Sequence, residues 1–158
     1  MEVDYPKDWS SLVPDVLICI KNAEKPEQLY GSLVVAKALV STYKRSMEQE
    51  RAPLEFIIEN LFPMLENLLV NEMMKNEAYS SRICQIILSI FCMANWMQFA
   101  RYLNADRLRI WMVAIKTLLN RRISPELTIK LSNWDEMIKR AEDPEWKIKA
   151  NCMKTVSR

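Results

Sequence analysis

The chain has 158 residues, of which 50% are hydrophobic and 27% are charged, a balance typical of a folded domain. It contains one glycine, Gly31, and no histidine. A single glycine excludes glycine-rich phosphate-binding loops, and the absence of histidine excludes histidine-dependent triads and the commonest metal ligand. The net charge of +2 is too balanced to indicate direct nucleic-acid binding. The composition therefore predicts an all-α protein that uses no cofactor or metal and is not an enzyme.

Apolar residues recur at helical spacing from the start of the chain. The first predicted helix covers Trp9 to Lys21, and the second runs from about Glu27 to Met47. Pro26 stands just before the second helix, where a first turn tolerates proline. A third helix begins near Leu54, and Pro63 inside it is expected to kink or divide it.

A longer helix is predicted from about Tyr79 to Arg101. It includes Ile83 to Ala100, a run without charged residues that is long enough to span a membrane. Polar side chains interrupt this run, among them Gln85 and Asn95, and each would need a partner in lipid. A buried helix between other helices is therefore favoured over a membrane span, and no membrane partner is expected.

The last third of the chain predicts two more helices with an irregular stretch between them. One covers about Ala105 to Leu119, and the other starts at Pro144 and continues to the end. The stripe of the last helix has no stop signal, so the chain is expected to be cut from a longer protein.

The predicted helices fall into three antiparallel pairs, at about 8–47, 54–101 and 105–158, with an insertion at about 120–143. First members begin roughly 46 and 51 residues apart, close to the ~40–47-residue period of HEAT repeats. We therefore expect a single HEAT-repeat α-solenoid fragment of about three pairs. A six-helix globular bundle would produce the same stripes and remains the alternative.

The four cysteines form no CxxC pair, which argues against a zinc or thioredoxin-type site. Apolar neighbours surround each of them, as at Cys19, so we expect buried free thiols in a reducing compartment.

Five segments, in order along nearly the whole chain, resemble the importin-β superfamily of nuclear transport receptors. The opening Tyr-Pro-Lys-Asp-Trp run is similar to an early HEAT helix of that superfamily. The other segments resemble the subgroup of importins seven and eight, including the connection Glu-Arg-Ala-Pro-Leu. The segments are Tyr5–Pro14, Leu29–Leu54, Leu61–Leu65, Gln85–Phe91 and Trp146–Lys149. The resemblance implies an N-terminal-half fragment of such a receptor. The acidic segment expected before the Trp-Trp pair of the subgroup is mixed in charge here, and only Trp146 of that pair is present.

The resemblance implies a function in nuclear import. Such a receptor binds cargo proteins, the Ran GTPase and phenylalanine-glycine nucleoporins, and moves between cytoplasm and nucleus through the pore. The alternative is a non-enzymatic HEAT scaffold of an unrelated cytosolic assembly. An enzyme with a carboxylate pair, such as Glu55 and Glu59, is the third class, but this spacing is common on helix surfaces.

In a HEAT stack the first helix of each pair lines the convex side and the second the concave side. Candidates for nucleoporin binding on the convex side are Phe56, Trp111 and Met112, with core packing as the alternative for each. Candidates for partner binding on the concave side share the polar stripe of the second helices, with a merely solvated face as the alternative. These residues are Lys37, Ser41, Lys44, Arg82, Gln85 and Ser89.

Overall fold

The computed structural model describes residues 11–46, 50–75, 78–121, 147–148 and 151–152. These residues form helices and connecting turns, and none of them lies in a β-strand. The helices are α1 (Leu12–Lys21), α2 (Pro26–Tyr43), α3 (Ala52–Met73), α4 (Ala78–Ala94) and α5 (Ala105–Asn120). The all-α prediction is confirmed.

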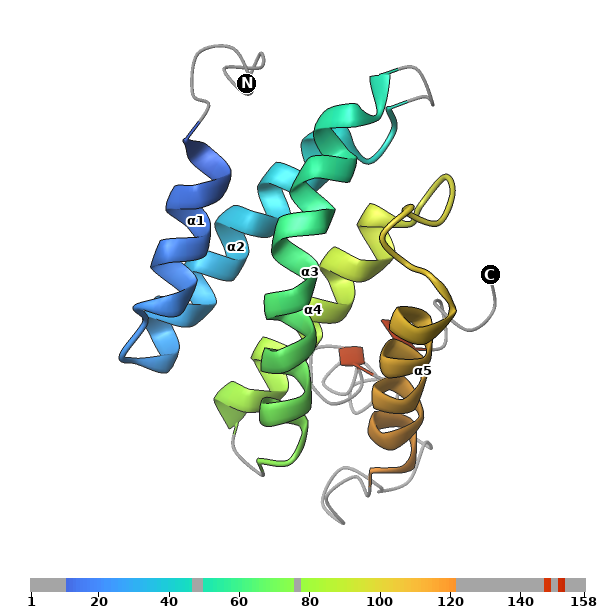
Figure 1. The fold of residues 1–158 in the computed structure, drawn as a ribbon. Coiled ribbons are helices and arrows are strands. Elements are labelled where there is room, and N and C mark those ends of the chain that lie inside the picture. The colour runs from blue at the N-terminus through green and yellow to red at the C-terminus, as the bar shows by residue number, and fades with distance from the viewer. Residues whose placement is uncertain (1–10, 47–49, 76–77, 122–146, 149–150, 153–158) are drawn as a thin grey trace, which may run out of the picture.

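The helices are arranged in two layers (Figure 1). Helices α1, α3 and α5 run in one direction and form the first layer, while α2 and α4 run the opposite way and form the second layer. Helix α3 packs against α1 and α5, and α2 packs against α4, so each helix contacts its counterpart in the next pair. This is the arrangement of a HEAT-like α-solenoid.

Two short helical stretches at 147–148 and 151–152 lie beside α4. Ile148 and Cys152 are buried, and the Asn151 side-chain amide donates to the backbone carbonyl of Gln85 in α4 at 3.4 Å. These stretches belong to the helix predicted after Pro144. The insertion predicted at about 120–143 lies outside the described residues from 122 onward.

The core between the layers contains a cluster of aromatic rings from three helices. Phe91 of α4 stacks on Trp111 of α5 with ring centroids 4.3 Å apart, and Phe62 of α3 lies 5.3 Å from the same indole. All three side chains are buried. Aromatic pairs at this separation add to the energy of burial, so this cluster joins the second helix pair to α5.

Pro63 does not divide α3, which runs through it as one helix of 22 residues. Proline removes one hydrogen bond to the carbonyl four residues earlier, which here belongs to Glu59. Glu59 and Asn60 are exposed, so this turn lies beside solvent that can replace the missing donor. The expected division is therefore wrong, because the buried face of α3 continues on both sides of Pro63.

Helix α4 ends at Ala94, seven residues before the predicted end at Arg101. The buried side chain of Asn95 donates to the Phe91 carbonyl at 2.8 Å and accepts from the Ala100 amide at 3.0 Å. An asparagine that bonds to nearby backbone in this way competes with the helix and ends it. None of the described helices combines the length and apolar character needed to cross a membrane.

The cysteine prediction is only partly correct. Cys84 and Cys152 are buried and lie outside any disulfide, and Cys92 is half-buried. Cys19 is exposed, because the buried residues of α1 are Val13, Val16 and Ile20, and Cys19 lies off that face.

Candidate functional site

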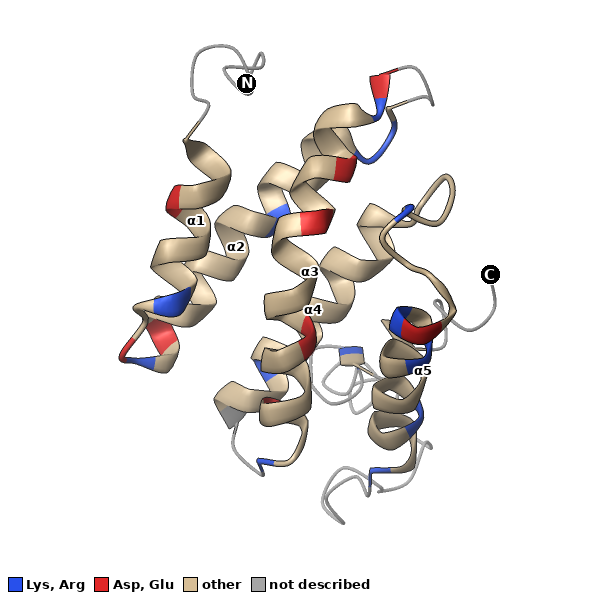
Figure 2. Cartoon of the chain, viewed as in Figure 1, with Lys and Arg blue, Asp and Glu red and all other residues tan. Residues whose placement is uncertain are grey.

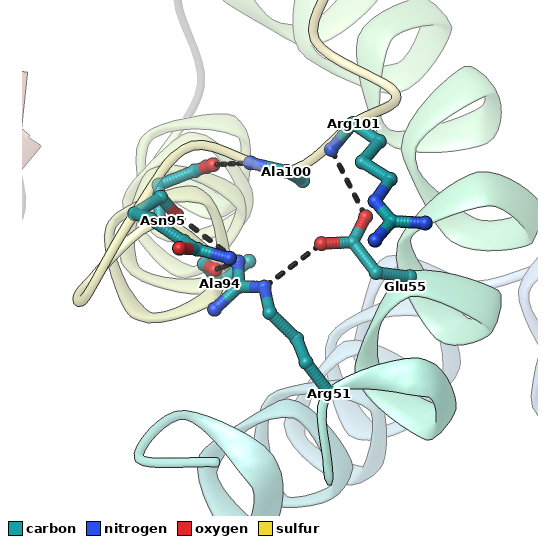
Figure 3. A network of polar contacts seen from close by, with 7 residues as sticks. Arg51, Glu55, Ala94, Asn95, Ala100 and Arg101 are labelled. Carbon is teal, nitrogen blue, oxygen red and sulfur yellow. Dashed lines mark hydrogen bonds and ion pairs between the residues drawn. The ribbon is translucent and has the colours of Figure 1, made fainter. Parts of the chain in front are cut away.

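Arg51 holds the turn that follows α4 (Figure 3). Its side chain is only 3% exposed, and one guanidinium nitrogen donates to the backbone carbonyls of Ala94 at 3.1 Å and Gln98 at 3.0 Å. The last carbonyls of a helix have no partner within the helix, and a cation there is favoured by the helix dipole. Arg51 therefore caps α4 from the start of α3.

Glu55 completes the attachment from the opposite side. One carboxylate oxygen pairs with Arg51 Nε at 2.8 Å, and the other accepts from the Arg101 backbone amide at 3.0 Å (Figure 3). Together with the Asn95 contacts, these bonds fix residues 95–101 at several points. The segment is thus a loop with a defined shape, which we call the 95–101 loop.

A pocket of about 230 Å³ lies between this loop and the outer surface of α3. Its wall combines an aromatic ring with charged and polar groups: Arg51, Ala52, Glu55, Phe56, Glu59, Gln98 and Arg101. This volume is below the ~300–1,000 Å³ typical of small-molecule sites. The pocket is therefore suited to a single inserted side chain of a partner.

Large apolar side chains are exposed on α3 and in the 95–101 loop, the two segments that line this pocket. Phe56 is 48% exposed, and in the 95–101 loop Trp96, Met97 and Phe99 are 54%, 58% and 53% exposed. Several large apolar residues exposed so close in sequence are typical of an interaction surface. The loop is held by polar contacts of its backbone, and about half of the surface of each of these side chains stays exposed.

Glu55 and Glu59 are not two unengaged carboxylates, as a catalytic carboxylate pair would require. Both line the pocket, but Glu55 is engaged by Arg51 and by the Arg101 amide. Among the described residues, no group of three or more cysteine, aspartate or glutamate side chains is placed to hold a metal ion.

A second polar centre, at Glu66 in α3, is buried and joins α3 to α5. Its carboxylate accepts from Trp111 Nε1 and Arg107 Nη1, each at 2.9 Å, and from the Tyr102 hydroxyl at 3.3 Å. Burial, with the negative charge of Glu66, raises the pKa of Tyr102 to about 12, although nearby Arg107 acts in the opposite direction. The Glu66 carboxylate is buried, while Arg107 and Tyr102 reach it from partly exposed positions, and the arrangement acts as a structural connection.

The three predicted convex residues are placed differently from one another. Phe56 is exposed and lines the pocket, and Met112 is half-buried against the core. Trp111 is 0% exposed and hydrogen-bonded to Glu66. It therefore packs in the core, which was the alternative interpretation, and a peptide in solvent cannot reach it.

The six predicted concave residues all keep some exposure and lie on the second layer. Arg82 is exposed, and the other five are half-buried. Lys37 and Ser41 belong to α2, Lys44 follows its last turn, and the remaining three belong to α4. Their role as a binding face stays a prediction.

Arg51 and the 95–101 loop were missed by sequence reasoning. A predicted helix up to Arg101 placed Trp96, Met97 and Phe99 inside a regular element. Asn95 was the available signal, since asparagine competes with helix by bonding to local backbone. No pattern in the sequence indicated that Arg51 would reach carbonyls more than 40 residues away.

Comparison with known proteins finds similarity to long importins. The chain is 30% identical over 128 residues to "Importin beta-like SAD2 homolog" of Arabidopsis thaliana. This match covers 78% of this chain and 12% of that protein. It is 26% identical over 156 residues to "Importin-8" of Homo sapiens and 25% identical to "Importin-8" of Mus musculus, covering 98% of this chain in both cases.

The chain spans 14% of the human protein and 15% of the mouse protein, so it corresponds to a small part of each of these relatives. No family model matches the chain, and no solved structure matches it. The sequence similarities, over a HEAT-like two-layer fold, support a relationship of this chain to the importin-β superfamily.

Proposed function

We propose that this chain is a helical-repeat segment of a nuclear import receptor, of the kind represented by importins seven and eight, and that it acts by binding rather than catalysis. Its partners are cargo proteins, the Ran GTPase and phenylalanine-glycine nucleoporins, and it moves between cytoplasm and nucleus through the pore. The similarity to the importins named above supports this proposal, together with the two-layer fold.

The observation that carries the proposal is the pocket beside Phe56. It lies between the first-layer helix α3 and the segment that leads into α5, the next first-layer helix. A phenylalanine ring inserted there would contact the ring of Phe56 and the chain around Gln98, while Trp96, Met97 and Phe99 offer further apolar surface. Offset aromatic contacts of this kind contribute about 0.5–1.5 kcal/mol each beyond simple burial.

The test is a titration of the complete chain with a phenylalanine-glycine repeat peptide, followed by NMR shifts or fluorescence anisotropy. We expect weak saturable binding, and we expect Phe56→Ala to weaken it by about tenfold because one aromatic contact is lost. Met74→Ala is the matched control, since Met74 is 75% exposed at the far end of α3 and should leave binding unchanged.

A serine-glycine peptide controls for non-specific binding. Equal loss of affinity in both variants would contradict the pocket as the site. Absence of binding to the phenylalanine-glycine peptide and to GTP-loaded Ran would favour an unrelated HEAT scaffold instead.

A further inference from the structure

The polar stripe of the second layer, which is at least partly exposed, is positively charged. We propose that this stripe, made of Lys37, Ser41, Lys44, Arg82, Gln85 and Ser89, binds an acidic segment of a partner protein. The inference rests on the proposed function, because it names the chemistry of the partner taken up on the concave face.

Packing leaves one side of α4 open. Helices α2 and α3 and the stretch around Asn151 each cover part of it. The side chains that stay at least partly exposed include Arg82, Gln85 and Ser89, whose spacing of three and four residues places them on one face. Lys37, Ser41 and Lys44 have the complementary spacing on α2 and its last turn. Because α2 packs against α4, the two sets lie on neighbouring helices of one layer.

Among the described residues, no acidic side chain pairs with the cations of this stripe. Figure 2 shows acidic positions along α3 and at the start of α2, where Glu27 lies, but α4 contains none. Among the described residues, Lys37, Lys44 and Arg82 take part in no ion pair. Lys147, half-buried and four residues before Asn151, adds a fourth cation beyond α4.

Three cations that contact α3 differ from those of the stripe in being paired. Arg51, Lys75 and Arg107 are each paired with a glutamate of the first-layer helix α3. Their charges are therefore used within the fold, whereas Lys37, Lys44 and Arg82 form no ion pair with any residue that the structure describes. Charge complementarity of this kind sets specificity and the rate of association.

An acidic protein segment fits the stripe better than a nucleic acid does. The cations are few and are spread over several helices, whereas affinity for a nucleic acid comes from many phosphate contacts. Between the cations lie Ser41, Gln85 and Ser89, whose hydroxyl and amide groups can donate hydrogen bonds to carboxylates.

The experiment measures binding of the complete chain to a fluorescent peptide rich in aspartate and glutamate, by anisotropy at several salt concentrations. Its glutamine and asparagine counterpart and a single-stranded oligonucleotide are the comparison probes. The test variant combines Lys37→Glu, Lys44→Glu and Arg82→Glu. The matched control combines Lys21→Glu, Arg109→Glu and Lys116→Glu, which change the net charge equally at exposed positions of α1 and α5. Circular dichroism checks that both variants fold.

We expect salt-sensitive binding of the acidic peptide alone, weakened at least about tenfold by the test variant and less than about twofold by the control. Equal weakening in both variants, or no binding by the unmodified chain, would overturn the inference. Tighter binding of the oligonucleotide through the same cations would also overturn it. The phenylalanine-glycine peptide is titrated in parallel with the unmodified chain. If that peptide does not bind while the acidic peptide does, the result counts against the proposed function and leaves the acidic preference standing.

Discussion

At the scale of single residues, Glu66 is a buried carboxylate with three donors around it. Trp111, Arg107 and Tyr102 each donate to it, and removing any one of them leaves a buried acceptor less satisfied. Arg51 is the corresponding buried cation, since its guanidinium is bonded to a glutamate and two backbone carbonyls. In both cases the buried charge joins helices that lie far apart in the sequence.

Tyr102 makes the stability of the fold dependent on pH in the alkaline range. Burial and the Glu66 carboxylate raise its pKa from 10.0 to about 12 in the folded chain. The folded state therefore holds the phenolic proton more tightly than the unfolded state, and this stabilisation is complete below pH 10. We expect the free energy of unfolding to fall as the pH rises from about 10 to about 12, in urea denaturation at stepped pH.

The Tyr102→Phe variant is the control for this dependence. It should be about 1 kcal/mol less stable at neutral pH, because a hydrogen bond to Glu66 is lost, and its stability should fall less between pH 10 and 12. The pKa of Tyr43 is also raised by burial, so the stability of both proteins should still depend to some extent on pH in this range. Identical pH profiles for the two proteins would show that Tyr102 is not the group concerned.

At the scale of elements, the 95–101 loop takes its shape from a residue on another helix. Replacing Arg51 by methionine keeps most of the apolar stem but removes the bonds to Ala94, Gln98 and Glu55. We expect a loss of about 2–3 kcal/mol in the free energy of unfolding, because buried carbonyls and the Glu55 carboxylate lose a charged donor.

Hydrogen exchange locates this effect. The amides of Ala100 and Arg101, which donate to Asn95 and Glu55, should exchange faster in Arg51→Met, while amides of α2 keep their protection. Arg109→Met is the matched control, since Arg109 is exposed on α5 and should change stability by less than about 0.5 kcal/mol. Unchanged exchange at Ala100 and Arg101 would contradict the role given to Arg51.

At the scale of the whole molecule, several of the polar contacts that join successive units span similar separations in sequence. Bonds from Arg51 to Gln98, from Arg101 to Glu55 and from Arg121 to Lys75 span 47, 46 and 46 residues, and Trp111 to Glu66 spans 45. These separations lie at the upper end of the HEAT period. Each unit is thus fastened mainly to its neighbour, as in other repeat proteins.

This arrangement predicts unfolding in stages. Trp111→Phe removes the bond to Glu66 and part of the aromatic cluster, so α5 should lose its contact with α3 first. Native-state hydrogen exchange should then show reduced protection along α5, with α1 and α2 nearly unchanged. Leu119→Met, a change of similar volume on α5, is the control. A uniform loss of protection in all five helices would show a single cooperative unit instead.

Much of the fold could be predicted, because it depends on local periodicity. Buried positions such as Leu33, Val40 and Ile87 recur at helical spacing, and polar or proline-bearing turns separate the runs. The candidate site was predicted only in part. Phe56 was identified by residue type, but Trp111 has the same type and spacing and lies in the core, since its indole nitrogen finds a buried partner in Glu66.

The sequence by itself therefore determined an all-helical chain, its order of helices and its likeness to importins. The tertiary structure decided where α4 ends, which aromatic residue stays exposed and which cations are paired. The physical reason is the range of the interactions. Apolar periodicity acts within one helix, whereas Arg51, Glu55 and Glu66 bond to groups 36 to 47 residues away.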